Sequence, residues 1–229
     1  MKIVNTPGNE QVEEMDKVND VSRRRFFQLA GGIAGAGVLL AACRTTPPST
    51  FFVGSGDAGL INYLNIIEQV QAGFYAQAVS TSYLNITVSE YTCFTDLRDQ
   101  AIAHRDYWNT LAGANAINKI VLDLSPVTFA DRTSTLSNAI TLAELAVAAY
   151  NGTAQLFSNT DYILTAGKIA TVQARRGAYM RDLLSYNSFA NSPAVNTSGL
   201  DLVSNPQNVM GTLQQYIQTK FDINKLPTF

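Results

Sequence analysis

The sequence predicts an all-α fold, a four-helix bundle with a long middle crossover and a short C-terminal helix. Four segments of more than twenty residues repeat their apolar residues at the period of a helix. The connection between the second and third segments is long, whereas a tight turn joins the third to the fourth. Helices of this length are longer than average but normal in bundles.

The first two predicted helices cover residues 57–80 and 95–115. The second begins at Thr95, a residue type that favours the position before a helix. It carries the only histidine of the chain, His104, on the same face as Trp108. An inward-facing lone histidine can be a metal ligand, a catalytic base or a packed core residue, and the helical pattern alone leaves these three interpretations open.

The third and fourth predicted helices cover residues 131–157 and 161–185, and Asp131 is a plausible cap of the third. The link before the third helix reads INKIVLDLSPVTFA. Its Pro126 prevents a continuous helix, and its alternating apolar residues indicate an extended crossover. A long middle connection of this kind favours the ferritin-like topology over a simple up-and-down bundle.

The remaining segments lie outside the predicted bundle. Residues 186–229 form a C-terminal extension, in which a short helix near 207–220 is expected to pack on the outside. Residues 1–43 have the pattern of a secretory signal, since arginines precede a short apolar run and small residues. That run is shorter than the roughly 20 apolar residues that a spanning helix needs. Residues 44–56, which include TTPPST, are expected to form a tether.

The leader also indicates a route and an anchor. Arg23 and Arg24, in SRRRFFQLAG, indicate the twin-arginine export route of bacteria. The sequence LAAC resembles the lipobox of bacterial lipoproteins, in which Cys43 would be lipidated and become the first mature residue. The protein is then expected on the periplasmic face of the cell envelope, with the membrane as its partner. An ordinary cysteine in an uncleaved leader is the alternative for Cys43.

Composition excludes several classes of function. Of 16 Lys and Arg in the chain five precede residue 44, and of 18 Asp and Glu also five, which leaves 11 basic and 13 acidic residues. This near-neutral balance argues against nucleic-acid binding, which needs a clustered basic face. One cysteine, Cys93, remains after the leader, so no internal disulfide is expected. A single histidine and no nucleophile motif make a hydrolase a weak hypothesis.

Four fragments resemble the helix motifs of the ferritin-like domain family, in the branch that includes desiccation-related proteins and many exported bacterial members. The similarity covers residues 57–185, and its fragments are IIEQVQAGFY, AHRDYWNTL, AVAAYNGTAQLF and QARRGAYMRDLL. Intact members of the family hold two irons in the bundle core. Their ligands are a Glu from each of two helices and a Glu-x-x-His pair from each of the other two.

The resemblance implies that several ligand positions have lost their ligands. Glu68 occupies the position of the first-helix glutamate. His104 is present in the second helix, but Ala101 stands three residues before it. Glu144 lies one residue away from the usual third-helix glutamate, so its inward placement is open. Gln173 replaces the glutamate of the fourth-helix pair, whose histidine position is occupied by an arginine.

That arginine, Arg176, cannot ligate a metal because a guanidinium has no free lone pair. We expect it to supply the missing positive charge by forking onto Glu68 or Glu144, with His104 and Gln173 hydrogen-bonded around the cluster. An exposed Glu68 and a solvated Arg176 are the alternative interpretations.

Two functional hypotheses follow from these positions. The first is an envelope-anchored, non-catalytic binding or structural module, linked to stress or desiccation, with a degenerate dinuclear metal site and no cofactor. The second is a metal-binding oxidoreductase or iron-storage protein that holds iron or manganese through Glu68, His104 and Glu144. Twin-arginine export favours the second, because that route often carries proteins folded around a cofactor.

Overall fold

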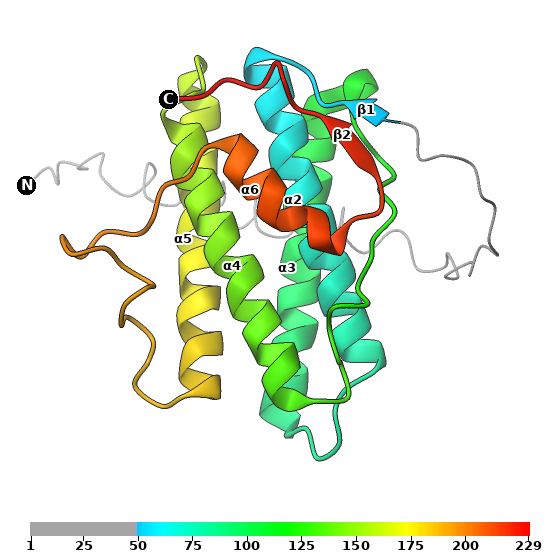
Figure 1. The fold of residues 1–229 in the computed structure, drawn as a ribbon, viewed down its shortest axis with the longest axis vertical. Helices are drawn as coiled ribbons and strands as arrows, with labels where there is room; N and C mark the ends of the chain where they lie inside the picture. The colour runs from blue at the N-terminus through cyan, green and yellow to red at the C-terminus, as the bar shows by residue number, and fades with distance from the viewer. Residues whose placement is uncertain (1–49) are drawn as a thin grey trace, which may run out of the picture. The chain divides into compact units, whose positions relative to one another are not determined.

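Four long helices dominate the computed structural model, which describes residues 50–229 (Figure 1). The predicted signal peptide, with Arg23, Arg24 and Cys43, and the first part of the tether lie outside the described residues. Residues 50–229 belong to one unit by their own contacts. The elements in order are β1 (Thr50–Phe52), α2 (Gly56–Ser80), α3 (Val88–Ala112), η1 (Gly113–Asn115), α4 (Arg132–Ala154), α5 (Thr160–Leu184), α6 (Pro206–Leu213), η2 (Gln214–Tyr216) and β2 (Lys220–Asp222).

The bundle has the predicted topology. Helices α2 and α3 form one antiparallel pair and α4 and α5 the other. The crossover after η1 runs along the bundle from one end to the other before α4 begins (Figure 1). It is extended for most of its length, as its alternating apolar residues and Pro126 predicted. The predicted all-α bundle with a short C-terminal helix is therefore confirmed.

The start predicted for the second helix is wrong by seven residues. Helix α3 begins at Val88, and Thr87 is its cap. The Thr87 side chain accepts from the backbone N–H of Glu90, whose carboxylate accepts in return from the Thr87 backbone N–H. This reciprocal capping box fixes the helix start. Thr95 instead lies inside the helix, where its hydroxyl donates to the Tyr91 carbonyl.

The third and fourth helices begin as predicted and end slightly early. Asp131 caps α4 by accepting from the Ser134 backbone N–H. Helix α4 ends at Ala154, three residues before the predicted end, and Asn159 then caps α5. The turn between them is held to the first helix, because the Asp57 carboxylate accepts hydrogen bonds from the segment 158–159.

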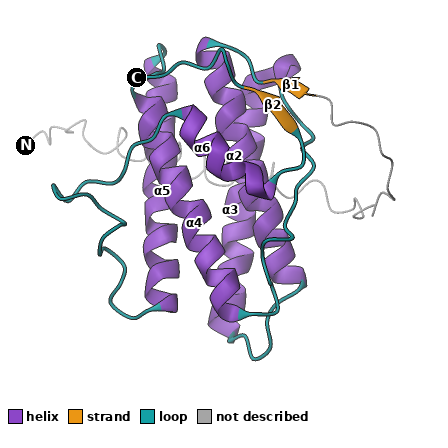
Figure 2. Ribbon diagram, in the orientation of Figure 1, coloured by secondary structure: helices purple, strands orange, loops and turns teal. Residues whose placement is uncertain are grey.

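The C-terminal extension departs from the prediction. Helix α6 ends at Leu213, and the chain then forms η2 and strand β2 instead of remaining helical to residue 220. Residues 217–220 alternate between buried and exposed, the two-residue period of a strand. Strand β2 pairs in parallel with β1, so the segment expected to be a tether ends in ordered structure at residues 50–56 (Figure 2).

The hydrophobic core lies between the four long helices and under α6. Its largest fully buried side chains include Trp108, Tyr63, Tyr75 and Tyr150. Burial on this scale is the main driving force for folding. Among the helices of residues 50–229, none combines the length and hydropathy needed to cross a membrane.

Candidate site in the bundle core

A set of polar side chains lies at the centre of the bundle, enclosed by apolar residues. Helix α2 contributes Glu68 and Gln71, both buried, and α5 contributes Gln173 and Arg176, also buried. His104, from α3, reaches the same place with a side chain that is 13 % exposed. Spacings of three residues place each pair from α2 and α5 on one helical face, one turn apart.

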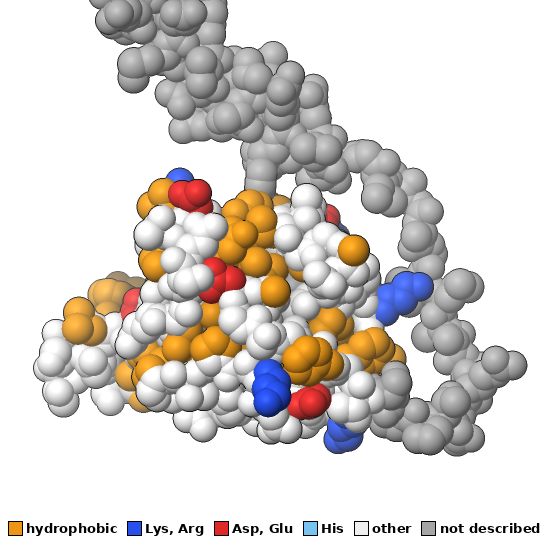
Figure 3. Space-filling model, turned by 90° about the horizontal axis from the view of Figure 1, so that it is seen from above, with side chains coloured by type: hydrophobic (Ala, Val, Ile, Leu, Met, Phe, Trp, Pro, Cys, Tyr) orange, Lys and Arg blue, Asp and Glu red, His pale blue; other side chains and the backbone are white. Residues whose placement is uncertain are grey.

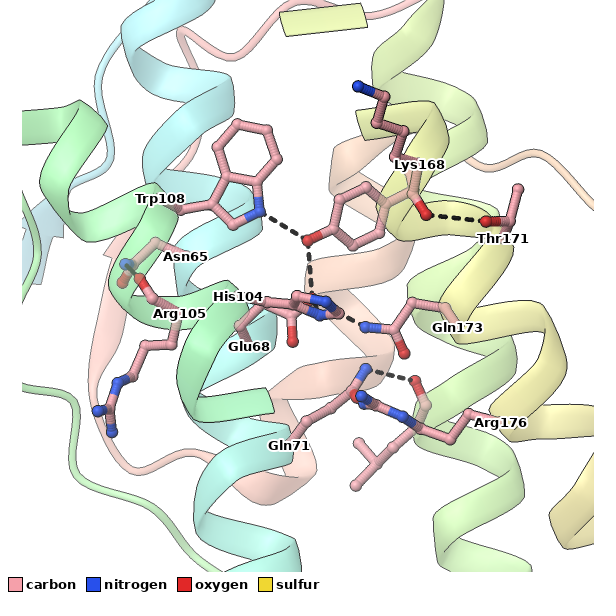
Figure 4. A network of polar contacts seen from close by, with 12 residues as sticks. Asn65, Glu68, Gln71, His104, Arg105, Trp108, Lys168, Thr171, Gln173 and Arg176 are labelled. Carbon is pink, nitrogen blue, oxygen red and sulfur yellow. Dashed lines mark hydrogen bonds and ion pairs between the residues drawn. The ribbon is translucent and has the colours of Figure 1, made fainter. Parts of the chain in front are cut away.

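Glu68 is the hub of this set. Its Oε1 accepts a hydrogen bond of 2.7 Å from the Tyr150 hydroxyl and one of 2.8 Å from the Gln173 amide. The Nδ1 atom of His104 lies 3.5 Å from the same oxygen but forms no hydrogen bond there, so the expected hydrogen bond of His104 is wrong, whereas that of Gln173 is present. Figure 4 shows Glu68, His104 and Gln173 pointing toward one another from three different helices.

The hydrogen bonding continues beyond Glu68 to an aromatic pair. The Tyr150 hydroxyl, which donates to Glu68, accepts a bond of 2.7 Å from the indole N–H of Trp108. Both rings are fully buried, and their centroids are 6.2 Å apart. The chain Trp108–Tyr150–Glu68–Gln173 thus joins four helices through three buried hydrogen bonds.

The surroundings of Glu68 set its charge. Burial raises the pKa of the carboxyl, but the His104 imidazole, the Arg176 guanidinium and the Tyr150 hydroxyl together hold the pKa below its usual range. Conversely, burial and the neighbouring Glu68 charge raise the pKa of Tyr150 well above its usual value. Donors aimed at a carboxylate favour its charged form. Glu68 is therefore ionised, and Tyr150 keeps its proton.

Arg176 occupies the core but does not form the expected fork. Its Nη1 donates to the Gln71 side chain, and its guanidinium lies 5.5 Å from the centre of the Tyr75 ring. Among the described residues, its Nε and Nη2 atoms have no hydrogen-bond partner. The predicted bidentate contact with Glu68 is wrong, because the guanidinium donates instead to Gln71, one turn along α2 from Glu68. The positive charge of Arg176 still attracts the negative charge of Glu68 through space, without a hydrogen bond between them.

Glu144 does not belong to the site. It is part-exposed on α4 and pairs with Arg181 of α5, which also donates to Asn191 of the C-terminal extension. Its neighbour Ala143 is fully buried and lies next to Gly177 of α5. The expectation that Glu144 faces the cluster is therefore corrected, since the inward position of this helix turn is taken by an alanine.

The residues present do not fit a dinuclear metal centre. Ala101 and Ala143 are both fully buried where carboxylates would have to stand. Residues 50–229 contain no group of three or more His, Cys, Asp or Glu side chains that could hold a metal ion. A buried guanidinium in the same core would also repel cations. The arrangement can stabilise the buried negative charge of Glu68 through hydrogen-bond donors, but it offers too few hard ligands for two metal ions.

Sequence reasoning missed three members of the network. These are Tyr150, Gln71 and Trp108, of which the sequence indicates only that Trp108 shares a helical face with His104. One pattern did point to them: Glu68 and Gln71 lie three residues apart on α2, as Gln173 and Arg176 do on α5. Paired polar residues on an otherwise apolar face indicate a buried polar contact.

The chain matches a known protein family. The sequence profile of the family described as a ferritin-like domain matches residues 56–186, more than half of the chain. The match covers all four long helices and every residue of the buried network. No curated protein matches the chain.

Proposed function

Because the chain belongs to the ferritin-like domain family, we propose that it is an envelope-anchored member whose dinuclear metal site has been replaced by a hydrogen-bonded network. It acts as a non-catalytic binding or structural module. The chain keeps the four-helix fold of the family, but the metal centre that would do redox chemistry is replaced by side chains that hydrogen-bond to one another.

The observation that carries the proposal is the place of Arg176. It stands at the histidine position of the fourth-helix pair, is 2 % exposed, and donates to Gln71 in the core. A buried cation costs several kcal/mol unless it is compensated. Arg176 compensates Glu68 electrostatically, a role that a metal ion would otherwise have.

The donors around Glu68 support the same proposal. Tyr150 and Gln173 both direct hydrogens at Oε1, and hydrogen bonds to a charged group are stronger than neutral ones. An amide at position 173 can donate to a carboxylate, which a glutamate in its ionised form cannot do. Gln173 therefore suits a core without metal better than the family's glutamate would.

A single metal ion is the second candidate function, favoured by one observation. Glu68 Oε2 and Gln173 Oε1 are buried and have no hydrogen-bond partner among the described residues, and His104 lies beside them. Together they could offer two oxygens and one nitrogen to one ion. Glu144, which the sequence included in this ligand set, is paired with Arg181 instead.

Metal analysis separates the two candidates. Protein that begins at Arg44 is produced with excess iron and manganese, desalted, and measured by elemental mass spectrometry. We expect metal far below one ion per chain. Near-stoichiometric iron or manganese that is lost in His104→Ala would overturn the proposal and establish the single-ion candidate.

A rebuilt site provides the matched control. The variant A101E/A143E/Q173E/R176H restores carboxylates and an imidazole at the four substituted positions, beside the native Glu68 and His104. We expect it to bind iron under the same conditions, which shows that the assay detects a site in this bundle. Circular dichroism establishes that the variant is helical before its metal content is compared.

The anchoring part of the proposal rests on the leader sequence. Metabolic labelling with an alkynyl fatty acid is expected to label the wild-type protein in a bacterial host and to leave Cys43→Ala unlabelled. Arg23→Lys combined with Arg24→Lys is expected to leave the protein in the cytoplasm. A wild-type protein without label in the envelope fraction would refute lipidation.

A further inference from the structure

A small surface with both apolar and basic side chains surrounds the point where the described chain begins. We call it the entry patch, and it consists of Phe52, Lys119, Val121, Lys220 and Lys225. Phe52 is 56 % exposed and Val121 57 %, and the three lysines are also exposed. Exposed aromatic side chains next to lysines are typical of surfaces that contact a lipid interface.

Three segments that are distant in sequence build the entry patch. Strand β1 pairs with β2, so that Thr50 lies beside Lys220 and Phe52 beside Asp222. Alternation along the strands then places Phe52 and Lys220 on the same face of the sheet. The crossover joins on the other edge, where the Gln218 backbone N–H donates to the Val121 carbonyl.

The charges favour an anionic partner. Three of the four lysines in residues 50–229 belong to the entry patch, and the fourth, Lys168, lies on α5. The acidic neighbours are Asp123 and Asp222, which are only partly exposed and accept from backbone N–H groups close by in the chain. Figure 3, which views the bundle from above, shows hydrophobic and basic side chains next to each other.

Chain length limits which end of the bundle can meet a membrane. Six residues, 44–49, separate Cys43 from Thr50, so the two are at most about 25 Å apart even when fully extended. A helix of 25 residues is about 37 Å long. Leu84 and Val88 are more exposed than Phe52 and Val121, but they belong to the loop after α2 and the start of α3, at the end of the bundle away from β1 (Figure 1).

From these observations we infer that the entry patch is a membrane-contact surface, which lies on a bilayer rich in anionic phospholipid. The Phe52 ring enters the headgroup region and the lysines meet the phosphates. The inference rests on the proposed lipid anchor for its geometry. Contact between the entry patch and the bilayer would add to the membrane affinity that the lipid on Cys43 gives.

Vesicle flotation tests the inference on protein that lacks the lipid anchor on Cys43. Protein that begins at Arg44 is mixed with vesicles of phosphatidylcholine alone or with 30 % phosphatidylglycerol, at low and at physiological salt. We expect binding to the anionic vesicles that weakens with salt. Each lysine at an anionic surface is worth about a fivefold change in partitioning, so K119E/K220E is expected to reduce binding at least tenfold.

Matched variants distinguish binding through the entry patch from nonspecific adsorption to vesicles. Phe52→Ser, whose ring is exposed, is expected to lower binding to both kinds of vesicle. The controls are L84S/V88S, which removes apolar surface at the far end, and Lys168→Glu, and both are expected to bind within twofold of wild type. Thermal melts verify that every variant is folded.

Equal binding by wild type and by the patch variants, or equal losses in the controls, would overturn the inference. Its failure is distinguishable from failure of the anchor, because flotation needs no lipid on Cys43. If fatty acid labels the protein but flotation does not depend on the patch, the entry patch is refuted as a membrane contact and the lipid anchor remains supported. If flotation depends on the patch but fatty acid does not label the protein, the entry patch remains supported as the membrane contact and the lipid anchor is refuted.

Discussion

Removing one hydroxyl tests whether the buried network stabilises the fold. In Tyr150→Phe the ring stays, but Glu68 loses a donor at 2.7 Å and the Trp108 indole loses its acceptor at 2.7 Å. A hydrogen bond to a charged group contributes about 1.5–3 kcal/mol, and a stranded buried donor costs about 1–3 kcal/mol. Together they predict a loss of about 4 kcal/mol in the free energy of unfolding.

The loss is measured by urea denaturation followed by circular dichroism, with thermal melts in parallel. For a domain of this size each kcal/mol corresponds to about 2–4 °C in Tm, so Tyr150→Phe is expected to melt about 8–15 °C below wild type. The slope of unfolding against urea should be unchanged, because the buried area is almost the same.

Tyr63 provides a matched control on the neighbouring helix. Its ring is as deeply buried as that of Tyr150, but its hydroxyl has no hydrogen-bond partner among the described residues. Removing an unpaired buried hydroxyl leaves nothing stranded, so Tyr63→Phe is expected to stay within about 0.5 kcal/mol of wild type or to exceed it. Equal losses in the two variants would refute the idea that the network stabilises the core.

Two further predictions concern other parts of the bundle. Burial raises the pKa of Glu90, but the Arg132 guanidinium and the hydrogen bonds from Thr87 together outweigh it and hold the pKa below its usual value. The pair therefore stabilises the fold above about pH 4.5 and is lost as the pH falls through the folded-state pKa, so Glu90→Gln should flatten the acid limb of a stability–pH curve. A Cβ at Gly152 would lie 2.2 Å from the Ser204 carbonyl oxygen, whereas one at Gly167 meets nothing within 4 Å. Gly152→Ala should thus loosen the C-terminal extension in limited proteolysis, and Gly167→Ala should raise Tm slightly because alanine favours a helix by about 1 kcal/mol; the reverse order would contradict this packing.

Helix type and order could be predicted from sequence because long apolar periods define them. The start of a helix was harder to predict where two residues of the capping type precede the same helical pattern. Thr95 has the right residue type, but only Thr87 has a glutamate three residues later to complete a capping box. The strands β1 and β2 were not predictable, because three residues each are too few for a period and they pair across almost the whole domain.

The site was partly predictable for a related reason. Helical spacing and the family resemblance brought Glu68, His104, Gln173 and Arg176 together correctly as inward positions. Which polar atoms then meet depends on axial offsets of a few ångströms between helices, which sequence patterns do not contain. Arg176 therefore meets Gln71 one turn from Glu68, although a direct fork is equally compatible with the spacing.

Charge balance supports the proposal that the metal site has been replaced. An intact dinuclear site sets four carboxylates against two divalent cations, so that its core is neutral. Removing the metals alone would leave several buried carboxylates, each of which costs several kcal/mol when ionised and unpaired. In this chain two carboxylate positions are alanines, Ala101 and Ala143, and a third is Gln173. The remaining charge, on Glu68, is matched by the positive charge of Arg176. Two divalent ions placed among these residues would leave a large excess of positive charge, so the core is neutral in its metal-free form.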